Sequence, residues 1–304
     1  MRRHLLIFAL LCCLAATVSG AVPLEGKFNW QKAEKLCDGV MYTTFSLKNP
    51  RLMKGGAVRI DLHNPNFKFI LTGRDKDWGK PMPDYQPKPT KRNPKPGLYP
   101  IRTRRETCRS FMERNIKQGE KVLAAVNTCG WGPWCPPWNH KYANPGGLII
   151  SDGVLVAPPR KKNHAVVIFK NGKVDLLTLT PESDLKNIKH AASGFGFVLR
   201  DGSVLGKPDS KSLAPRTGIG LSKDGRYLYL FAIDGRQPRY SMGANTYEVG
   251  QYLKYYGAEK GLNMDGGGST TLLVRKKKKI IKLNHHAMDS ERSIAVTLLL
   301  ALKK

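Results

Sequence analysis

The sequence predicts an α+β fold, in which a single strand-rich domain carries a few helices packed on a mixed or antiparallel sheet. Short segments that alternate apolar and polar residues recur along the chain, as in residues 42–47 and 57–62, and this period is typical of half-buried strands. Asp-Gly or Asn-Gly dipeptides, which favour tight hairpin turns, separate several of these segments. With 304 residues the chain has room for one large or two ordinary domains. The dominance of strands favours one.

The expected strands extend from the N-terminal region to the C-terminus. Residues 67–71 follow the first two strands after an Asn- and Pro-containing turn. Residues 122–126 form a continuous apolar run, typical of a buried strand, which ends on Asn127. A last strand is expected at residues 292–299. Between them we expect hairpins at residues 147–156, 164–179, 195–205, 217–233 and 271–283.

Two segments have a helical period. Residues 103–119 place Phe111, Met112 and Ile116 on one face. Residues 245–256 carry Glu248 and are followed by Gly257, a residue typical of helix C-termini. We therefore expect two helices against a background of strands.

The N-terminus predicts export. Two arginines precede an apolar run at residues 5–18, and small residues follow it, which is the pattern of a secretory signal peptide. We expect residues 1–20 to be the signal and residues 21–304 to be the mature domain, periplasmic or secreted. No second apolar run approaches transmembrane length, so no membrane span is expected.

Four cysteines remain after the expected signal: Cys37, Cys108, Cys129 and Cys135. An even number in an oxidising compartment suggests two disulfides, and we favour the pairs 129–135 and 37–108, with three pairings open. A zinc site is the weaker alternative, because no Cys-x-x-Cys occurs. No cofactor is expected, although clustered aspartates leave a structural calcium ion open.

The chain is strongly basic, with a formal net charge of +28. Such a charge attracts polyanions non-specifically. Nucleic acid is not expected, because no basic-helix or zinc-finger pattern occurs. An exported protein meets anionic glycans instead, although solubility alone is an alternative explanation. Residues 74–100, rich in proline and lysine, form a long loop or insertion. The loop at 128–147 gathers aromatic residues, including Trp131 and Trp134, suited either to stacking on sugars or to packing.

A triple-glycine turn is the most distinctive motif. Asp265 precedes Gly266, Gly267 and Gly268, and Ser269 follows. Glycine is costly in entropy and is used where φ is positive or where something approaches the backbone closely. Successive N–H groups in such a turn can hold an anion. The motif predicts a site for a charged, phosphate-like or sugar-like substrate, and the alternative is an αβ connection whose aspartate caps its own turn.

Several motifs together resemble the phosphodiester glycosidase family. They are residues 125–127, 146–153, 215–220, 234–236, Glu248, 263–270 and 291–293. The resemblance covers roughly residues 38–302 and departs from the family at Thr128, where a glycine is usual. It implies hydrolysis of a sugar–phosphate glycosidic bond, with a sugar phosphodiester or anionic glycan as substrate; the oligomeric state is left open.

The resemblance implies roles for individual residues. Asp265 would be the nucleophile or base and Glu248 the second carboxylate, as acid/base or orienting group. Arg216 and Arg236 would hold the phosphate. The remaining expected site residues are the donors Gly266, Gly267, Gly268 and Ser269, the sugar-binding Asn127 and Asp234, and the supporting Asn263, Thr270 and Arg292.

Each role has a structural alternative. Asp234-Gly235 is a common turn, Glu248 can be an ordinary helix-surface acid, and Arg292 can pair with Glu291 or Asp289. Ser269 lacks a nucleophile-elbow setting, which argues against a serine hydrolase. Two other functions also remain open. One is a non-catalytic module that binds anionic glycan or cell-wall polymer, and the other is a metal-dependent phosphodiesterase.

Overall fold

Strands dominate the computed structural model, which describes residues 24, 26–85, 97, 99–134, 139–288 and 290–304. This part of the chain has two α-helices, α1 (Cys108–Lys117) and α2 (Thr246–Tyr256), and two 3-10 turns, η1 (Trp30–Lys32) and η2 (Gly267–Ser269). The strand pairs in its four sheets are antiparallel. The sheet that the sequence left as mixed or antiparallel is therefore antiparallel. The expected signal peptide and residues 86–96 of the Pro/Lys-rich loop lie outside the described residues.

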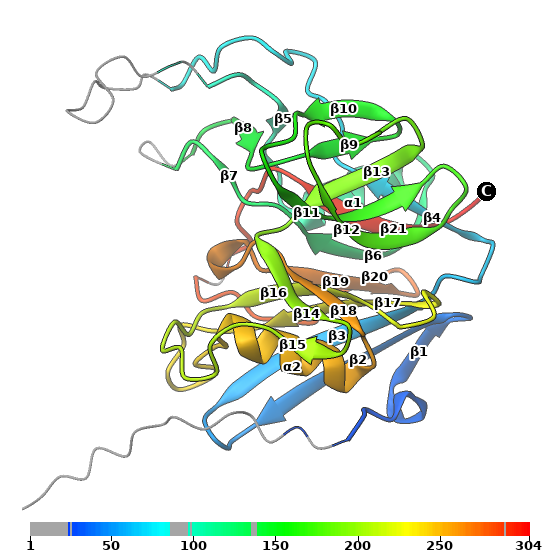
Figure 1. Cartoon of the computed structure of the whole chain (residues 1–304), viewed down its shortest axis with the longest axis vertical. Coiled ribbons are helices and arrows are strands. Elements are labelled where there is room, and N and C mark those ends of the chain that lie inside the picture. Colours follow the sequence, from blue (N-terminus) through cyan, green and yellow to red (C-terminus); the bar gives the residue numbers. More distant parts are fainter. Residues whose placement is uncertain (1–23, 25, 86–96, 98, 135–138, 289) are drawn as a thin grey trace, which may run out of the picture.

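The largest sheet has eight strands and forms the lower half of the molecule in Figure 1. Their order across the sheet is β1-β2-β3-β17-β16-β18-β14-β15. The strands are β1 (Glu34–Cys37), β2 (Val40–Leu47), β3 (Met53–Asp61), β14 (Gly196–Arg200), β15 (Ser203–Val204), β16 (Arg216–Leu221), β17 (Tyr227–Ile233) and β18 (Lys260–Asn263).

Three smaller sheets lie above it (Figure 1). The first, in the order β20-β19-β6-β21-β4, contains β4 (Phe67–Leu71), β6 (Lys121–Asn127), β19 (Leu272–Lys276), β20 (Lys279–Lys282) and β21 (Thr297–Leu302). The second, in the order β10-β9-β13-β11-β12, contains β9 (Ile149–Ser151), β10 (Val154–Ala157), β11 (Asn163–Phe169), β12 (Val174–Leu179) and β13 (Ile188–Ser193). The third contains β5 (Thr103–Arg104), β7 (Trp131–Gly132) and β8 (Tyr142–Pro145).

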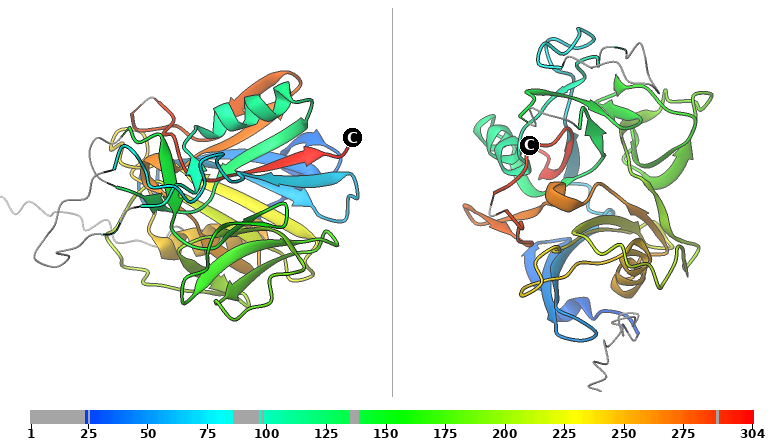
Figure 2. Two further views of the ribbon diagram at one scale, coloured as in Figure 1. Left: turned by 90° about the horizontal axis from the view of Figure 1, so that it is seen from above. Right: turned by 90° about the vertical axis from the view of Figure 1, so that its left-hand side faces the viewer.

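One hydrophobic core joins the three larger sheets. Ile60 of β3, Val126 of β6 and Val166 of β11 belong to the same cluster and are fully buried. α2 packs on the opposite face of the eight-stranded sheet, where Phe231 and Tyr252 stack with their ring centroids 5.0 Å apart. α1 covers β6 and lies beside the C-terminal strand β21 (Figure 2). The apolar faces of the strands and helices are therefore buried between these layers.

Both predicted helices are present, and α1 is shorter than the predicted residues 103–119 at both ends. α2 is preceded by its N-cap Asn245 and closed by Gly257 at φ 109°, as expected. α1 starts at Cys108 rather than at residue 103, because the Thr107 side chain accepts a hydrogen bond from the Ser110 N–H at 2.9 Å and caps the helix there. Residues 103–104 pair as a strand instead.

The five predicted hairpins are present as β9–β10, β11–β12, β14–β15, β16–β17 and β19–β20. At the first turn, Asp152 and Gly153 both have positive φ, 51° and 76°, which the twist of a two-residue hairpin requires. The last strand starts at Thr297 rather than at residue 292. The structure also adds β13, which no clear alternation in the sequence had indicated.

The predicted disulfide between Cys37 and Cys108 is wrong, because both are free thiols. Cys37 ends the edge strand β1 of the eight-stranded sheet, whereas Cys108 begins α1 on a different sheet. Cys129 is also a buried free thiol, and Cys135 lies outside the described residues. Burial raises the pKa of the Cys129 thiol to about 12. Separately, none of the described helices is long and apolar enough to cross a bilayer.

Candidate active site

The triple-glycine turn connects β18 to β19 and is tied to its neighbours by backbone hydrogen bonds. The Asp265 N–H donates to the Thr128 carbonyl at 2.7 Å, and the Gly267 N–H donates to the Pro215 carbonyl at 2.8 Å. The Asn127 side chain donates to the Asp265 carbonyl at 2.7 Å. The turn is thus held between the ends of β6 and β16, which fixes the carboxylate that precedes it.

At each of the three glycines, a different neighbouring group would be too close to an added Cβ atom. A Cβ on Gly266 would lie 2.6 Å from the Pro215 carbonyl oxygen. Gly267 has φ +61°, and a Cβ there would lie 3.1 Å from the Arg236 guanidinium. A Cβ on Gly268 would overlap the Arg292 guanidinium. The turn is bare because two arginines lie directly against it.

Asp265 is half-buried and faces this turn. Its carboxylate accepts a hydrogen bond from the Gly266 N–H at 3.0 Å. Burial raises the pKa of Asp265 to about 6, against the opposing effects of Ser269, the Gly266 N–H and Arg292. A shift of this size is common at functional sites.

Asp265 lines a pocket of about 770 Å³, here called the Asp265 pocket. Its described lining has five cationic side chains and one carboxylate. The cations are Arg160, Lys162, Arg216, Arg236 and Arg292. An excess of this kind favours an anionic ligand.

A second pocket of about 590 Å³ adjoins it, here called the Met288 pocket. Trp134, Arg236, Gly267 and Arg292 line both. The two guanidinium groups therefore lie where the pockets meet. Arg292 is further held over the Trp134 ring, 4.6 Å from its centroid.

Two exposed aromatic side chains line the Asp265 pocket. Trp134 is 57% exposed and Phe195 is 64% exposed, which is unusual for side chains of this size. Phe195 lies against Gly130, where an added Cβ would meet its ring at 2.8 Å. Exposed rings at the mouth of a pocket suit stacking on a ligand. Trp131, by contrast, is half-buried and packed under the Arg105 guanidinium at 4.2 Å.

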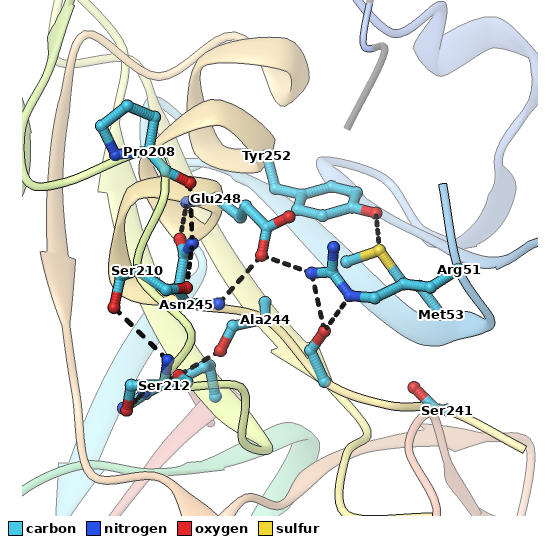
Figure 3. Close-up of polar contacts among 12 residues, drawn as sticks. Arg51, Met53, Pro208, Ser210, Ser212, Ser241, Ala244, Asn245, Glu248 and Tyr252 are labelled. Carbon is cyan, nitrogen blue, oxygen red and sulfur yellow. Dashed lines mark hydrogen bonds and ion pairs between the residues drawn. The ribbon is translucent and has the colours of Figure 1, made fainter. Parts of the chain in front are cut away.

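Glu248, predicted as a second catalytic carboxylate, lines neither pocket. Its carboxylate accepts hydrogen bonds from Arg51 at 2.5 Å and from the Asn245 N–H at 2.9 Å (Figure 3). The Arg51 and Glu248 side chains are only 4% and 3% exposed. In this structure the Glu248 carboxylate is held by the buried Arg51 pair and by the capping box of α2.

Arg216 lies at the edge of the same network. Its Nε donates to the Ala244 carbonyl at 3.1 Å, and one terminal nitrogen donates to the Ser212 carbonyl at 2.8 Å. Burial, and secondarily Arg236, lower its pKa from the usual range. The guanidinium is therefore oriented by backbone carbonyls while it lines the Asp265 pocket.

The other predicted sugar-binding residues are buried. Asn127 is 1% exposed and accepts hydrogen bonds from the Thr217 hydroxyl at 2.8 Å and the Thr271 N–H at 2.9 Å. Asp234 is 2% exposed, accepts the His285 N–H at 2.6 Å, and has its pKa raised by burial to about 7. Neither lines the two pockets, so both position backbone.

The structure thus brings together most of the predicted site and leaves part of it out. Asp265, Arg216, Arg236, Gly266, Gly267, Gly268, Ser269, Thr270 and Arg292 line one or both pockets, whereas Glu248, Asn127, Asp234 and Asn263 do not. Asn263 is 5% exposed, and its Oδ1 has no hydrogen-bond partner among the described residues.

Sequence reasoning missed Arg160, Lys162 and Phe195. The first two belong to a basic run, residues 160–162, that looked like part of the general positive charge. Phe195 stands between Gly194 and Gly196, and this glycine-flanked aromatic was the available indication. In the described ranges, no three His, Cys, Asp or Glu side chains cluster as a metal site would require.

Comparison with known proteins decides the family. The phosphodiester glycosidase family model matches residues 124–301, more than half of the chain. The chain belongs to the phosphodiester glycosidase family. The match includes Asn127, Arg216, Asp265 and Arg292. No curated protein matches the chain.

Three solved structures share the fold of this member of the phosphodiester glycosidase family. The zebrafish N-acetylglucosamine-1-phosphodiester alpha-N-acetylglucosaminidase catalytic domain, auto-inhibited by its pro-peptide, is 18% identical, with a TM-score of 0.58 over 87% of this chain and 83% of that one. A hypothetical protein from Synechocystis is 11% identical, with a TM-score of 0.56 over 88% of this chain and 62% of that one. A Burkholderia pseudomallei K96243 protein described as exported is 14% identical, with a TM-score of 0.53 over 83% of this chain and 74% of that one. At these identities the likeness concerns the fold alone.

Proposed function

We propose that this protein is an exported glycosidase that hydrolyses a sugar-1-phosphodiester by cleaving the C1–O bond, which releases the sugar and a phosphate monoester. The observation that carries the proposal is the position of Asp265 beside a bare glycine turn flanked by the Arg236 and Arg292 guanidiniums. A carboxylate and paired cations at one site match a sugar joined to a phosphate.

Asp265 is assigned to the reacting carbon. A carboxylate next to C1 stabilises the oxocarbenium character of the transition state, either by direct attack or by activating water. Asn127 holds the backbone of Asp265 in place through its 2.7 Å hydrogen bond. The exposed rings of Phe195 and Trp134 offer stacking surfaces for the sugar.

The phosphate is assigned to Arg236 and Arg292, with Arg216 and the turn N–H groups nearby. Arginine matches the planar arrangement of two phosphate oxygens. A phosphate monoester leaves as a stable anion, and cations that meet its developing charge replace much of what an acid catalyst would supply. This explains how the reaction proceeds although Glu248 lines neither pocket.

The experiment is turnover of a panel of sugar-1-phosphodiesters by the purified mature chain, beginning with N-acetylglucosamine, the sugar in the name of the zebrafish relative. Sugar release from one or more diesters, and its loss in Asp265→Asn, supports the proposal. A binding module for anionic glycan would be favoured by two results together. No diester would release sugar, and Asp265→Asn would bind the diester as tightly as the unchanged chain does.

Export rests on two observations. The N-terminal pattern at residues 1–20 is that of a signal peptide, and one structural relative is described as exported. Fractionation of a host that expresses the full chain tests this. The protein is expected outside the cytoplasm with residues 1–20 removed, and retention of the intact N-terminus in the cytoplasm would contradict it.

A further inference from the structure

We propose that the Met288 pocket binds the leaving group of the substrate, and that this group is uncharged with an apolar face rather than a polyanionic polymer. The proposal rests on the function proposed above. It goes beyond it by naming the chemistry of the group on the far side of the phosphate.

The arrangement of the two pockets indicates how the substrate would be oriented between them. Asp265 lines the Asp265 pocket and not the Met288 pocket, whereas Arg236 and Arg292 line both. A group that acts at C1 approaches from the face opposite the departing oxygen. With the sugar beside Asp265 and the phosphate between the two arginines, the ester group on the phosphate continues into the Met288 pocket.

The chemistry of the wall indicates what it accepts. Among the described lining there is no carboxylate, and Trp134, Pro215, Ala287 and Met288 contribute apolar surface. Met288 is 79% exposed, so its flexible thioether side chain is available to contact an apolar group that enters the pocket.

One further cation, Arg105, lines the Met288 pocket besides the two at the junction. Its guanidinium donates to the carbonyls of His140 at 2.9 Å and Ser293 at 3.2 Å, and stacks on Trp131. These contacts direct its N–H groups to backbone oxygens. Among the described lining residues, the wall beyond the phosphate therefore offers no set of arginine or lysine side chains for a second anionic group.

The pocket wall is also preformed. The Asn284 side chain donates to the Thr270 carbonyl at 3.0 Å, and the His285 N–H donates to Asp234 at 2.6 Å. Burial lowers the pKa of His286 to about 4, so this ring is neutral at physiological pH. The Thr270 hydroxyl is buried and has no hydrogen-bond partner within the described residues. A fixed wall binds without an ordering cost.

The test compares benzyl and methyl diesters of one sugar 1-phosphate, taken from the panel above. The benzyl diester is expected to have a kcat/KM about tenfold higher, mostly through KM, because its ring buries apolar surface. Met288→Ser should bring the ratio of the benzyl to the methyl kcat/KM toward one. Phe195→Ser, which removes an exposed ring from the sugar side, should lower kcat/KM for both diesters and keep their ratio. Val154→Ser, at an exposed hairpin away from both pockets, is the matched control.

The two proposals fail separately. Hydrolysis of both diesters at equal kcat/KM, or a Met288→Ser variant that keeps the full ratio, would overturn the leaving-group pocket and leave the glycosidase intact. If no diester is hydrolysed, the Kd values of the benzyl and methyl esters of a sugar C-phosphonate, which lacks the C1–O bond, decide the matter. Tighter binding of the benzyl ester that depends on Met288 supports the pocket, and equal binding refutes it.

Discussion

The pKa of Asp265 sets a pH dependence. Burial raises this pKa to about 6, and the proposed role requires the carboxylate form. The carboxylate fraction is therefore complete above pH 7 and falls about tenfold per pH unit below pH 6. We expect kcat/KM to follow this limb, measured with a phosphodiester whose own charge is constant over the range. A rate that is flat down to pH 4.5 would contradict an essential carboxylate at this position.

Gly268 offers a test of the contact between the turn and Arg292. A Cβ there would overlap the guanidinium, which is the far end of a flexible side chain. Gly268→Ala should therefore displace Arg292 at little cost in stability, and we expect kcat/KM to fall about 10²-fold, as small displacements of a positioning group do. Gly73→Ala is the control, because open space surrounds that position. Full activity in Gly268→Ala would mean that catalysis does not depend on the observed position of the Arg292 guanidinium.

Among the secondary-structure elements, α2 carries a buried acid, Glu248, whose structural and catalytic roles can be tested separately. Glu248 and Arg51 form a pair that is almost fully buried. Removing one charge from such a pair costs about 3–5 kcal/mol. Glu248→Gln should lower the free energy of unfolding by about this amount in urea titrations, while Glu113→Gln on the exposed face of α1 should not.

The same variant separates structure from catalysis. At a temperature where Glu248→Gln is fully folded, we expect its kcat to stay within about threefold of the unchanged protein. Loss of a general acid or base costs 10²–10⁴-fold. A fall of that size in the folded variant would restore Glu248 to the catalytic machinery.

Local signals in the sequence were enough to predict many of the elements. The cap at Asn245, the glycine at 257 and the Asp-Gly turns act within a few residues, so α2 and the hairpins could be predicted. β13 could not, because its stabilisation comes from pairing with β9 and β11 rather than from its own pattern. The disulfide prediction failed for a related reason, because it needed the positions of distant sheets.

The candidate site shows the same division. The Asp265 turn could be recognised because three successive glycines are costly in entropy and indicate positive φ or a close approach to the backbone. Asn127 and Asp234 were correctly recognised as polar residues at strand ends, but whether such a side chain faces a pocket or the interior depends on tertiary packing. Phe195 and Arg160 were missed because they come to the pocket from different loops.

At the scale of the whole molecule, charge is the dominant feature. The whole sequence has a formal net charge of +28, and the described lining of the Asp265 pocket has five cationic side chains and one carboxylate. Attraction of an anionic diester should therefore weaken with salt, since the screening length falls from about 8 Å at 0.15 M to about 3 Å at 1 M. We expect kcat/KM to drop about tenfold over this range, with kcat changed much less. A kcat/KM independent of salt would show that the charge serves another purpose.

The proposed reaction breaks the C1–O bond and not the P–O bond. Hydrolysis of an active diester in ¹⁸O-labelled water, with mass spectrometry of the phosphate monoester, tests it directly, because the oxygens of that product do not exchange with water during the assay. Attack at C1 beside Asp265 predicts a phosphate monoester without label and a label in the freshly released sugar. Label in the phosphate monoester would contradict the account and would favour a phosphodiesterase.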